Sequence, residues 1–321
     1  MNPLIQALQN VPREWRMDRR QLLKGLGAAT AAAAWPSRAA ASAEFHSTSV
    51  SPFLADLKAT WVNHYTYIAP DLNKTADWYM EVFGMQKGHS DSRQVHLWFG
   101  DTGGDALMIV RQANVGEQAP GLEKMAFTIE NWDQGAVEAE LKRRGLHPIT
   151  DTDRGFWFHD LEGNEIGVFA KDFMTRPAAP PTTPTLWKAV SVNHIQLISG
   201  DNTTLAPWYK DLLNMSQNPG GANYLWFGDS IVVTNGGLFT DVRLRGGEGR
   251  STSASLKRLD HAAYTIENYD HAAVEAELTR RGLRPREDFA LSYNCVDING
   301  APTQVCDIGL VPLAERIASG N

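Results

Sequence analysis

Two almost identical stretches decide the fold of this chain: VEAELKRRGLHP at Val137–Pro148 and VEAELTRRGLRP at Val274–Pro285. Only two of the twelve positions differ, and each stretch predicts a helix that ends at Arg-Arg-Gly, where cations and glycine suit a helix C-terminus. The copies are 137 residues apart. Self-similarity at a long fixed offset is typical of repeated structural units, so the sequence predicts a duplicated domain.

The similarity between the two halves extends well beyond these helices. Further matches are Thr128–Asn131 with Thr265–Asn268, Asn63-His64 with Asn193-His194, and Trp98–Asp101 with Trp226–Asp229. We therefore predict two copies of one domain, at residues 55–172 and 188–312. Residues 173–187 between them are rich in proline and are expected to form an extended linker.

Each copy contains one coarse pattern twice: a strand, an amphipathic helix and further strands. In the first copy we predict the opening strand at Val62–Ile68 and the helix at Thr75–Phe83. In the second copy the equivalents are Val192–Ile198 and Leu205–Leu213. A new strand before each VEAEL helix starts the pattern again, so the sequence indicates an α+β fold of four similar units.

Composition excludes several classes of protein. The 321 residues include 30 Lys and Arg against 37 Asp and Glu, and this net charge of −7, without a basic block, gives no electrostatic support for nucleic-acid binding. Two cysteines are too few for a disulfide scaffold or a cysteine-rich zinc module. No apolar run of 18 residues occurs, so no membrane span is expected.

The first 43 residues resemble a twin-arginine export signal. Arg19-Arg20 precedes a weakly apolar stretch at Gly25–Trp35, and Ala41-Ser42-Ala43 has the A-x-A pattern of a cleavage site. The alternative is an amphipathic helix with an incidental arginine pair. The leader carries six basic and two acidic residues, so cleavage after Ala43 changes the net charge from −7 to −11. The resemblance implies a periplasmic or secreted protein.

The order of elements, together with three local motifs, resembles the vicinal oxygen chelate superfamily. The motifs are a histidine in the first strand, the sequence His261–Thr265, and an Asp-x-x-Gly turn before the last strand. This superfamily includes glyoxalase I, bleomycin-resistance proteins and extradiol ring-cleaving dioxygenases. The resemblance implies tandem βαβββ modules, four in number, that form two cupped-sheet domains with a divalent metal in a cup.

Carried over position by position, the resemblance implies the metal ligands. In the second copy they are His194, His261 and Gln304, where the family usually has Glu at the third position; in the first copy the equivalents are His64, Lys124 and Gly167. A lysine ammonium repels a cation, and glycine has no ligand atom. We therefore expect a metal only in the second copy, and an ordinary hydrogen-bonded histidine at position 64.

Two imidazoles and one oxygen ligand resemble the facial set that binds Fe(II) and leaves positions open for substrate. We expect Fe(II), with Mn(II) and Zn(II) as alternatives. Because the Gln304 amide is neutral, the ion keeps its full charge, which weakens its binding and favours an anionic substrate such as a catecholate or enolate. The interpretation left open is a degenerate site whose histidines only form hydrogen bonds.

Extradiol enzymes have a catalytic tyrosine ten residues before the third ligand, where this chain has Asn294 beside Tyr293. We take Tyr293 and Asn294 as candidate catalytic residues, although the parity of the strand predicts that Tyr293 faces the other side of the sheet. His271, at the start of the second VEAEL helix, is expected to face solvent.

Two features near the predicted site have alternative interpretations. Cys295 and Cys306 flank the last hairpin and allow a cross-strand disulfide, but the family's strand parity places them on opposite faces and favours free thiols. The loop at Asn235–Ser255, which contains three arginines, is either a lid over the cup or a solvated surface loop.

Three functions remain in competition. The first is an exported, metal-dependent, dioxygenase-like enzyme that acts on a small oxygenated compound, aromatic in one version, in the C-terminal cup. The second is a non-catalytic protein that sequesters a small molecule, as bleomycin-resistance proteins do. The third is a structural role for the duplicated scaffold. The sequence says nothing about the oligomeric state.

Overall fold

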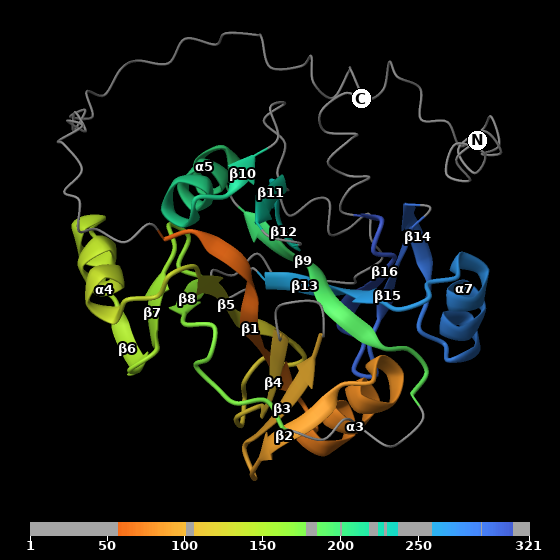
Figure 1. Ribbon diagram of the computed structural model, residues 1–321. Helices are drawn as coiled ribbons and strands as arrows, with labels where there is room; N and C mark the ends of the chain where they lie inside the picture. Colours follow the sequence, from red (N-terminus) through yellow and green to blue (C-terminus); the bar gives the residue numbers. More distant parts are fainter. Residues whose placement is uncertain are drawn as a thin grey trace, which may run out of the picture. The chain divides into compact units, whose positions relative to one another are not determined.

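Four strand–helix–strand–strand–strand units follow one another along the chain (Figure 1). The computed structural model describes residues 57–100, 106–177, 185–199, 201–217, 224–227, 230–236, 259–289 and 291–310. The first unit has β1 (Ala59–Ala69), α3 (Leu72–Phe83), β2 (Gln86–Ser90), β3 (Gln94–Phe99) and β4 (Ala106–Gln112); the second has β5 (Gly121–Ile129), α4 (Gln134–Arg143), β6 (Ile149–Thr152), β7 (Gly155–His159) and β8 (Glu165–Phe169). The third has β9 (Ala189–Ser199), α5 (Asn202–Leu213), β10 (Ser216–Gln217), β11 (Tyr224–Phe227) and β12 (Ser230–Gly236); the fourth has β13 (Leu259–Ile266), α7 (His271–Arg280), β14 (Arg286–Phe289), β15 (Ser292–Val296) and β16 (Pro302–Cys306).

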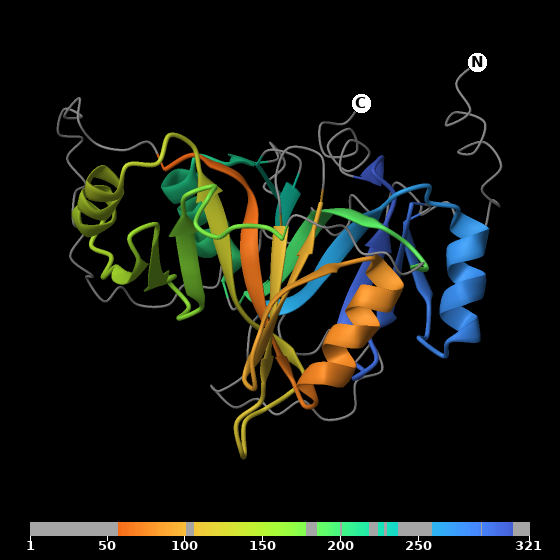
Figure 2. The same cartoon turned by 60° about the horizontal axis from the view of Figure 1, so that its bottom comes forward.

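The four units make two sheets of eight strands each. Their strand orders are β2-β3-β4-β1-β5-β8-β7-β6 and β10-β11-β12-β9-β13-β16-β15-β14. In each sheet the opening strands of the two units pair antiparallel at the centre, and each opening strand pairs in parallel with the last strand of its own unit. Helices α4 and α7 lie at opposite ends of the two sheets (Figure 2). The predicted α+β fold of four βαβββ modules is confirmed.

Each of the four described helices begins directly after an aspartate. Asp71, Asp133, Asp201 and Asp270 precede α3, α4, α5 and α7, and each carboxylate accepts a hydrogen bond from a backbone N–H of the first turn. This capping satisfies donors that have no partner within the helix. The same residue type at the same place in all four units explains why their helices begin at equivalent points of the repeat.

The predicted opening strands and first helices are confirmed: they lie within β1, β9, α3 and α5. The sequence patterns missed the short strands at the sheet edges, β2, β6, β10 and β14. Strand β6 shows the reason, because every one of its residues is exposed and no apolar–polar alternation marks it.

Several predictions fall on residues outside the described ranges. These are the leader at residues 1–43, the prolines of the linker from Pro180 onward, and most of the loop at Asn235–Ser255. Within the described ranges, no helix is long and apolar enough to span a bilayer.

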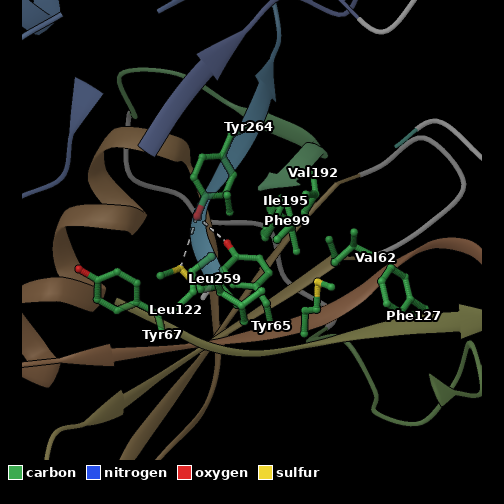
Figure 3. Packing of buried hydrophobic residues seen from close by; sticks show 14 of the residues in the cluster. Val62, Tyr65, Tyr67, Phe99, Leu122, Phe127, Val192, Ile195, Leu259 and Tyr264 are labelled. Carbon is green, nitrogen blue, oxygen red and sulfur yellow. Dashed lines mark hydrogen bonds between the residues drawn. The ribbon is translucent and has the colours of Figure 1, made fainter. Parts of the chain in front are cut away.

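One hydrophobic core joins the two sheets. Alternate residues of each central strand point into it, as period-two alternation requires, and they include Tyr65 of β1, Ile195 of β9 and Tyr264 of β13. At its centre the hydroxyls of Tyr65 and Tyr264 form a hydrogen bond of 2.6 Å (Figure 3). The described residues from 57 to 310 accordingly form one compact unit, in which each copy buries apolar side chains of the other.

Equivalent tyrosine–aspartate hydrogen bonds cross between the copies in both directions. Tyr209 of α5 donates to Asp160 Oδ2 at 2.8 Å, and Tyr79 of α3 donates to Asp297 Oδ2 at 3.2 Å. Asp297 also accepts from Tyr67, and burial raises the pKa of this carboxyl. Each aspartate begins the Asp-x-x-Gly turn of one copy and is held by a helix of the other, so these turns lock the copies together.

We expect Tyr209→Phe to cost more stability than Tyr79→Phe. Tyr209 gives Asp160 its only described tyrosine hydrogen bond, whereas Asp297 keeps Tyr67 when Tyr79 is changed. The expected loss is ~2 kcal/mol for Tyr209→Phe and less than ~1 kcal/mol for Tyr79→Phe, measured as the free energy of urea unfolding. Equal losses, or the reverse order, would contradict this account of the interface.

Candidate metal centre

Three adjacent strands of the second sheet bring the predicted ligands together. Ala263 of β13 is the register partner of both His194 on β9 and Gln304 on β16, and His261 lies two residues earlier on β13, on the same face. His261 Nε2 lies 3.2 Å from Gln304 Oε1, and the ring centroids of His194 and His261 are 5.4 Å apart. We call this face the C-terminal cup. All three side chains are buried.

The outer nitrogen of His194 is fixed by Asn193. His194 Nδ1 lies 3.0 Å from Asn193 Oδ1, while Asn193 Nδ2 donates to Thr265 Oγ1 at 3.1 Å and so orients the amide. With Nδ1–H donating to an oxygen, Nε2 carries the lone pair. Burial, together with the nearby His261, lowers the pKa of His194 to about 3, so the ring is neutral at pH 7 and can act as a ligand.

His261 Nε2 and Gln304 Oε1 point toward each other. His261 Nδ1 lies 2.8 Å from Asp260 Oδ2, which places the ring proton on Nδ1, and Gln304 Nε2 donates to Asp288 Oδ2 at 3.4 Å, which turns Oε1 toward His261. Two lone pairs at 3.2 Å repel unless a positive charge joins them, either a second ring proton or a metal ion. The donor set therefore fits a divalent cation.

The sequence analysis missed the two carboxylates behind these ligands. Asp260 directly precedes His261 in the sequence, and this adjacency was the available signal. Asp288 lies on β14, an edge strand that the sequence patterns did not predict, so no signal pointed to it. Each carboxylate contacts a predicted ligand from its outer side, Asp260 at His261 and Asp288 at Gln304.

The two candidate catalytic residues lie on opposite faces of β15. Asn294 is the register partner of Gln304 and shares its face, and Ser292, two residues earlier, lies on that face with an Oγ that has no hydrogen-bond partner among the described residues. Tyr293 points to the other face, where its hydroxyl lies 2.7 Å from His271 Nε2. The structure thus brings Asn294 toward the predicted ligands and does not bring Tyr293, because neighbours along a strand face opposite ways.

His271 is not the solvent-facing residue that the sequence suggested. Its ring stacks on Tyr293 with centroids 4.4 Å apart, and its Nδ1 lies 3.1 Å from the Tyr269 hydroxyl. Its side chain is only 35% exposed, and its Nε2 also contacts Glu287. The His271 ring is partly covered because α7 packs on β15, which places the first turn of the helix against Tyr293. Burial raises the pKa of Tyr293 to about 12.

The two cysteines are free thiols on different faces. Cys295 pairs across the hairpin with Thr303, and Cys306 pairs with Ser292, so the two residues are not opposite each other. Cys295 belongs to the shared core, whereas Cys306 packs with Ala263 in the C-terminal cup. The expected placement of the two cysteines on opposite faces is confirmed.

The equivalent face of the first sheet, which we call the N-terminal cup, is filled by aromatic rings. His64, Ala126 and Gly167 are register partners, just as His194, Ala263 and Gln304 are. Phe173 stacks on the His64 ring with centroids 4.7 Å apart, and Phe169 lies at the same distance edge-on. A Cβ added at Gly167 would lie 2.6 Å from the Phe169 ring, so no side chain fits there.

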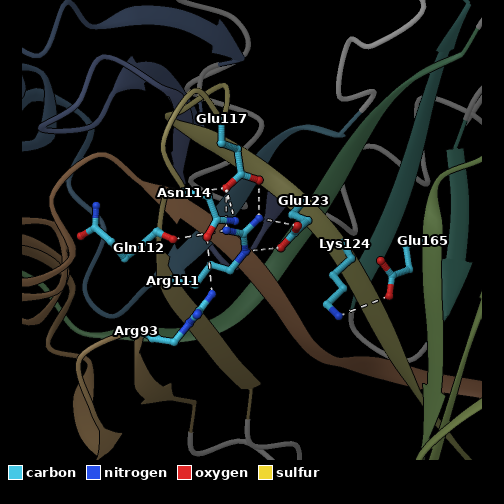
Figure 4. A network of polar contacts seen from close by, with 8 residues as sticks. All are labelled: Arg93, Arg111, Gln112, Asn114, Glu117, Glu123, Lys124 and Glu165. Atoms are coloured by element: carbon cyan, nitrogen blue, oxygen red, sulfur yellow. Dashed lines mark hydrogen bonds and ion pairs between the residues drawn. The ribbon is translucent and has the colours of Figure 1, made fainter.

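The position that corresponds to His261 is occupied by a lysine, Lys124. Lys124 Nζ lies 4.1 Å from the centroid of the Trp157 ring and 3.3 Å from Glu165 (Figure 4). The preceding residue, Glu123, which corresponds to Asp260, binds Arg111 instead. With an ammonium, a glycine and packed rings in place of ligands, the residues of the N-terminal cup do not fit a metal.

Comparison with known proteins agrees with this fold. Residues 61–166 match the family described as the Glyoxalase/Bleomycin resistance protein/Dioxygenase superfamily. A comparison with curated protein sequences found no match. The match to the family thus lies in the half that carries the N-terminal cup.

Solved structures extend the likeness to both halves. The 2,3-dioxygenase LapB from Pseudomonas sp. KL28 has a TM-score of 0.55 at 13% identity, over 78% of this chain and 93% of its own. Homoprotocatechuate 2,3-dioxygenase from Brevibacterium fuscum has a TM-score of 0.57 at 15% identity, over 79% and 82%. The Mn(II)-bound glyoxalase from Novosphingobium aromaticivorans has 0.53 at 16%, over 78% and 83%. At these identities the likeness is one of fold.

The buried His64 predicts a pH-dependent stability. Burial, followed by the nearby Lys124, lowers the pKa of His64 to about 3 in the folded chain. Between that pKa and the ordinary value near 6.5 the unfolded chain binds a proton that the folded chain does not, so stability is lost as the pH falls through 6.5. From pH 7 to pH 5 we expect His64 to contribute a loss of about 2 kcal/mol.

His64→Gln should reduce the pH dependence of the unfolding free energy by that amount, measured by urea unfolding at pH 7 and pH 5. His96 and His194, whose pKa values are also lowered by burial, contribute to the slope that remains. A slope identical to that of the wild type would show that His64 takes up a proton in the folded chain.

Proposed function

We propose that this chain is a metal-dependent, dioxygenase-like enzyme that acts on a small oxygenated compound in the C-terminal cup, with His194, His261 and Gln304 as the metal ligands. The observation that carries the proposal is the contact between His261 Nε2 and Gln304 Oε1 at 3.2 Å, which either a second ring proton or a bound metal ion would satisfy, on the face that also carries His194. The fold shared with two 2,3-dioxygenases and a Mn(II)-bound glyoxalase supports the same conclusion.

The proposed metal is Fe(II) or Mn(II). Such an ion would act as a Lewis acid toward two neighbouring substrate oxygens and stabilise negative charge that develops on them. The chain's own residues prepare the site: His194 and His261 turn Nε2 toward the cup, and Gln304 contributes an amide oxygen. Because none of these three ligands carries charge, the site favours an anionic substrate.

The strand beside the ligands offers groups that can orient a substrate. Asn294 and Ser292 of β15 lie on the same face as Gln304, and Ser292 Oγ is buried without a partner among the described residues. A buried hydroxyl without a hydrogen bond is costly, so a substrate oxygen that bonds to it gains affinity. We assign these two residues to substrate binding next to the metal.

Metal analysis of the mature protein tests the proposal. After anaerobic loading with Fe(II) or Mn(II) and removal of free metal, we expect about one equivalent in the wild type and far less in His194→Ala and His261→Ala. The matched control is His64→Ala, which removes the equivalent histidine of the N-terminal cup and should leave the metal content unchanged.

A metal content below about a tenth of an equivalent in the wild type would contradict the proposed metal-dependent enzyme and favour a protein that only sequesters a small molecule. If metal binds, oxygen uptake with a panel of catechols tests the dioxygenase chemistry. Uptake that requires the metal and is lost in His261→Ala would support it, whereas no uptake with any catechol would refute ring cleavage.

The proposal includes export through the leader at residues 1–43. Replacing Arg19 and Arg20 together by lysine should keep the full-length chain in the cytoplasmic fraction, because the paired arginines are the feature that resembles the export signal. Replacing Arg13 and Arg16 by lysine is the matched control and should still give the shortened chain in the periplasmic fraction, as detected by mass spectrometry. Export of both variants would refute the twin-arginine assignment.

A further inference from the structure

The duplication provides an internal control for the groups that surround the candidate metal site. In both halves the histidine of the opening strand is held by the same clamp. Asn63 Oδ1 lies 2.8 Å from His64 Nδ1, and Asn193 Oδ1 lies 3.0 Å from His194 Nδ1. Each asparagine in turn donates to the equivalent threonine, Thr128 or Thr265. This clamp is present where no metal fits, so it serves the scaffold.

The residue before the second ligand behaves differently in the two halves. In the N-terminal half Glu123 binds Arg111 at 2.5 and 2.8 Å (Figure 4) and is followed by Lys124. In the C-terminal half the carboxylate of Asp260 lies 2.8 Å from Nδ1 of the neighbouring His261. Among the equivalent positions that the structure describes, a carboxylate thus lies on the outer nitrogen of a candidate ligand only in the half whose residues fit a metal.

Asp260 is also well placed to hold this orientation. Its side chain is only 14% exposed, and its Oδ2 accepts a second hydrogen bond from Gln196 Nε2 at 3.3 Å. Gln196 follows His194 by two residues on β9 and is the register partner of His261. The carboxylate is therefore tied to both central strands, and His261 can turn only by breaking this link.

The charge at the candidate site also depends on Asp260. His194, His261 and Gln304 leave a divalent ion with its full charge, whereas a carboxylate behind an imidazole makes that imidazole a better donor and offsets part of the charge. Resting on the proposed function, we infer that Asp260 is the positioning residue of this site: it fixes His261 with Nε2 toward the cup and supplies from behind the negative charge that Gln304 does not supply as a ligand.

The decisive variant is Asp260→Asn. Both described hydrogen bonds of Asp260 go to the same oxygen, Oδ2, so an asparagine carbonyl at that place can keep both while the negative charge is removed. We expect Co(II) and Mn(II) to bind about 10- to 100-fold more weakly, measured by titration calorimetry. The visible absorption spectrum of the Co(II) protein should also change, because the donor strength of His261 changes.

Two further variants separate this role from a merely structural one. Glu123→Gln makes the same chemical change at the equivalent position of the N-terminal half and should leave the Co(II) affinity and spectrum unchanged. Asp260→Glu keeps the charge and should retain most of the affinity. Near-ultraviolet circular dichroism shows whether Asp260→Asn folds. If it does not, Asp260→Glu and Glu123→Gln still test the inference. Loss of Co(II) affinity in Asp260→Glu, or in both variants, overturns the inference.

The outcomes distinguish the inference from the function on which it rests. If wild-type protein binds no Co(II) or Mn(II), the proposed function fails and the inference fails with it. If the wild type binds and folded Asp260→Asn binds equally well with the same spectrum, the metal site stands and the role of Asp260 is overturned. Weaker binding in Asp260→Asn, with Glu123→Gln unchanged, supports the inference.

Discussion

The register of β9, β13 and β16 is the constraint on which the candidate site depends. Ala263 lies between His194 and Gln304 across three hydrogen-bonded strands, and this alignment brings together residues more than a hundred positions apart in the chain. A slip of one residue would turn these side chains into the shared core, where Tyr264 and Ile195 already pack. The same apolar packing that stabilises the two halves therefore also fixes the positions of the three candidate ligands.

The two halves show how one scaffold supports opposite outcomes. The strand order and the central register are the same, and each half keeps its Asn–His–Thr clamp. The face opposite the shared core differs. In the first half aromatic rings cover His64 and leave room only for glycine at position 167. In the second half the corresponding space holds the polar side chains of His261 and Gln304, each of which contacts a carboxylate on its outer side. The N-terminal half packs against the C-terminal half, and both contribute apolar side chains to the shared core.

Much of the architecture could be predicted because the repeat and the apolar alternation are local. The VEAEL helices, the opening strands and the positions equivalent to His194 and His261 all follow from short matches along the chain. The edge strands could not be predicted, since β6 is exposed at every residue and has no pattern. Asp288 was missed for the same reason, because it lies on the edge strand β14. The surroundings of His271 depended on the packing of α7, which no local pattern specifies.

The sequence by itself determined the duplication, the βαβββ order and the residue types that make a metal improbable in one half and feasible in the other. A lysine and a glycine exclude ligand chemistry wherever the backbone places them. Only the tertiary structure decided that His194, His261 and Gln304 meet, that Tyr293 turns away from them, and that Asp260 stands behind His261. These outcomes depend on register and face across strands that are distant in sequence, and such relations are set by packing in the shared core.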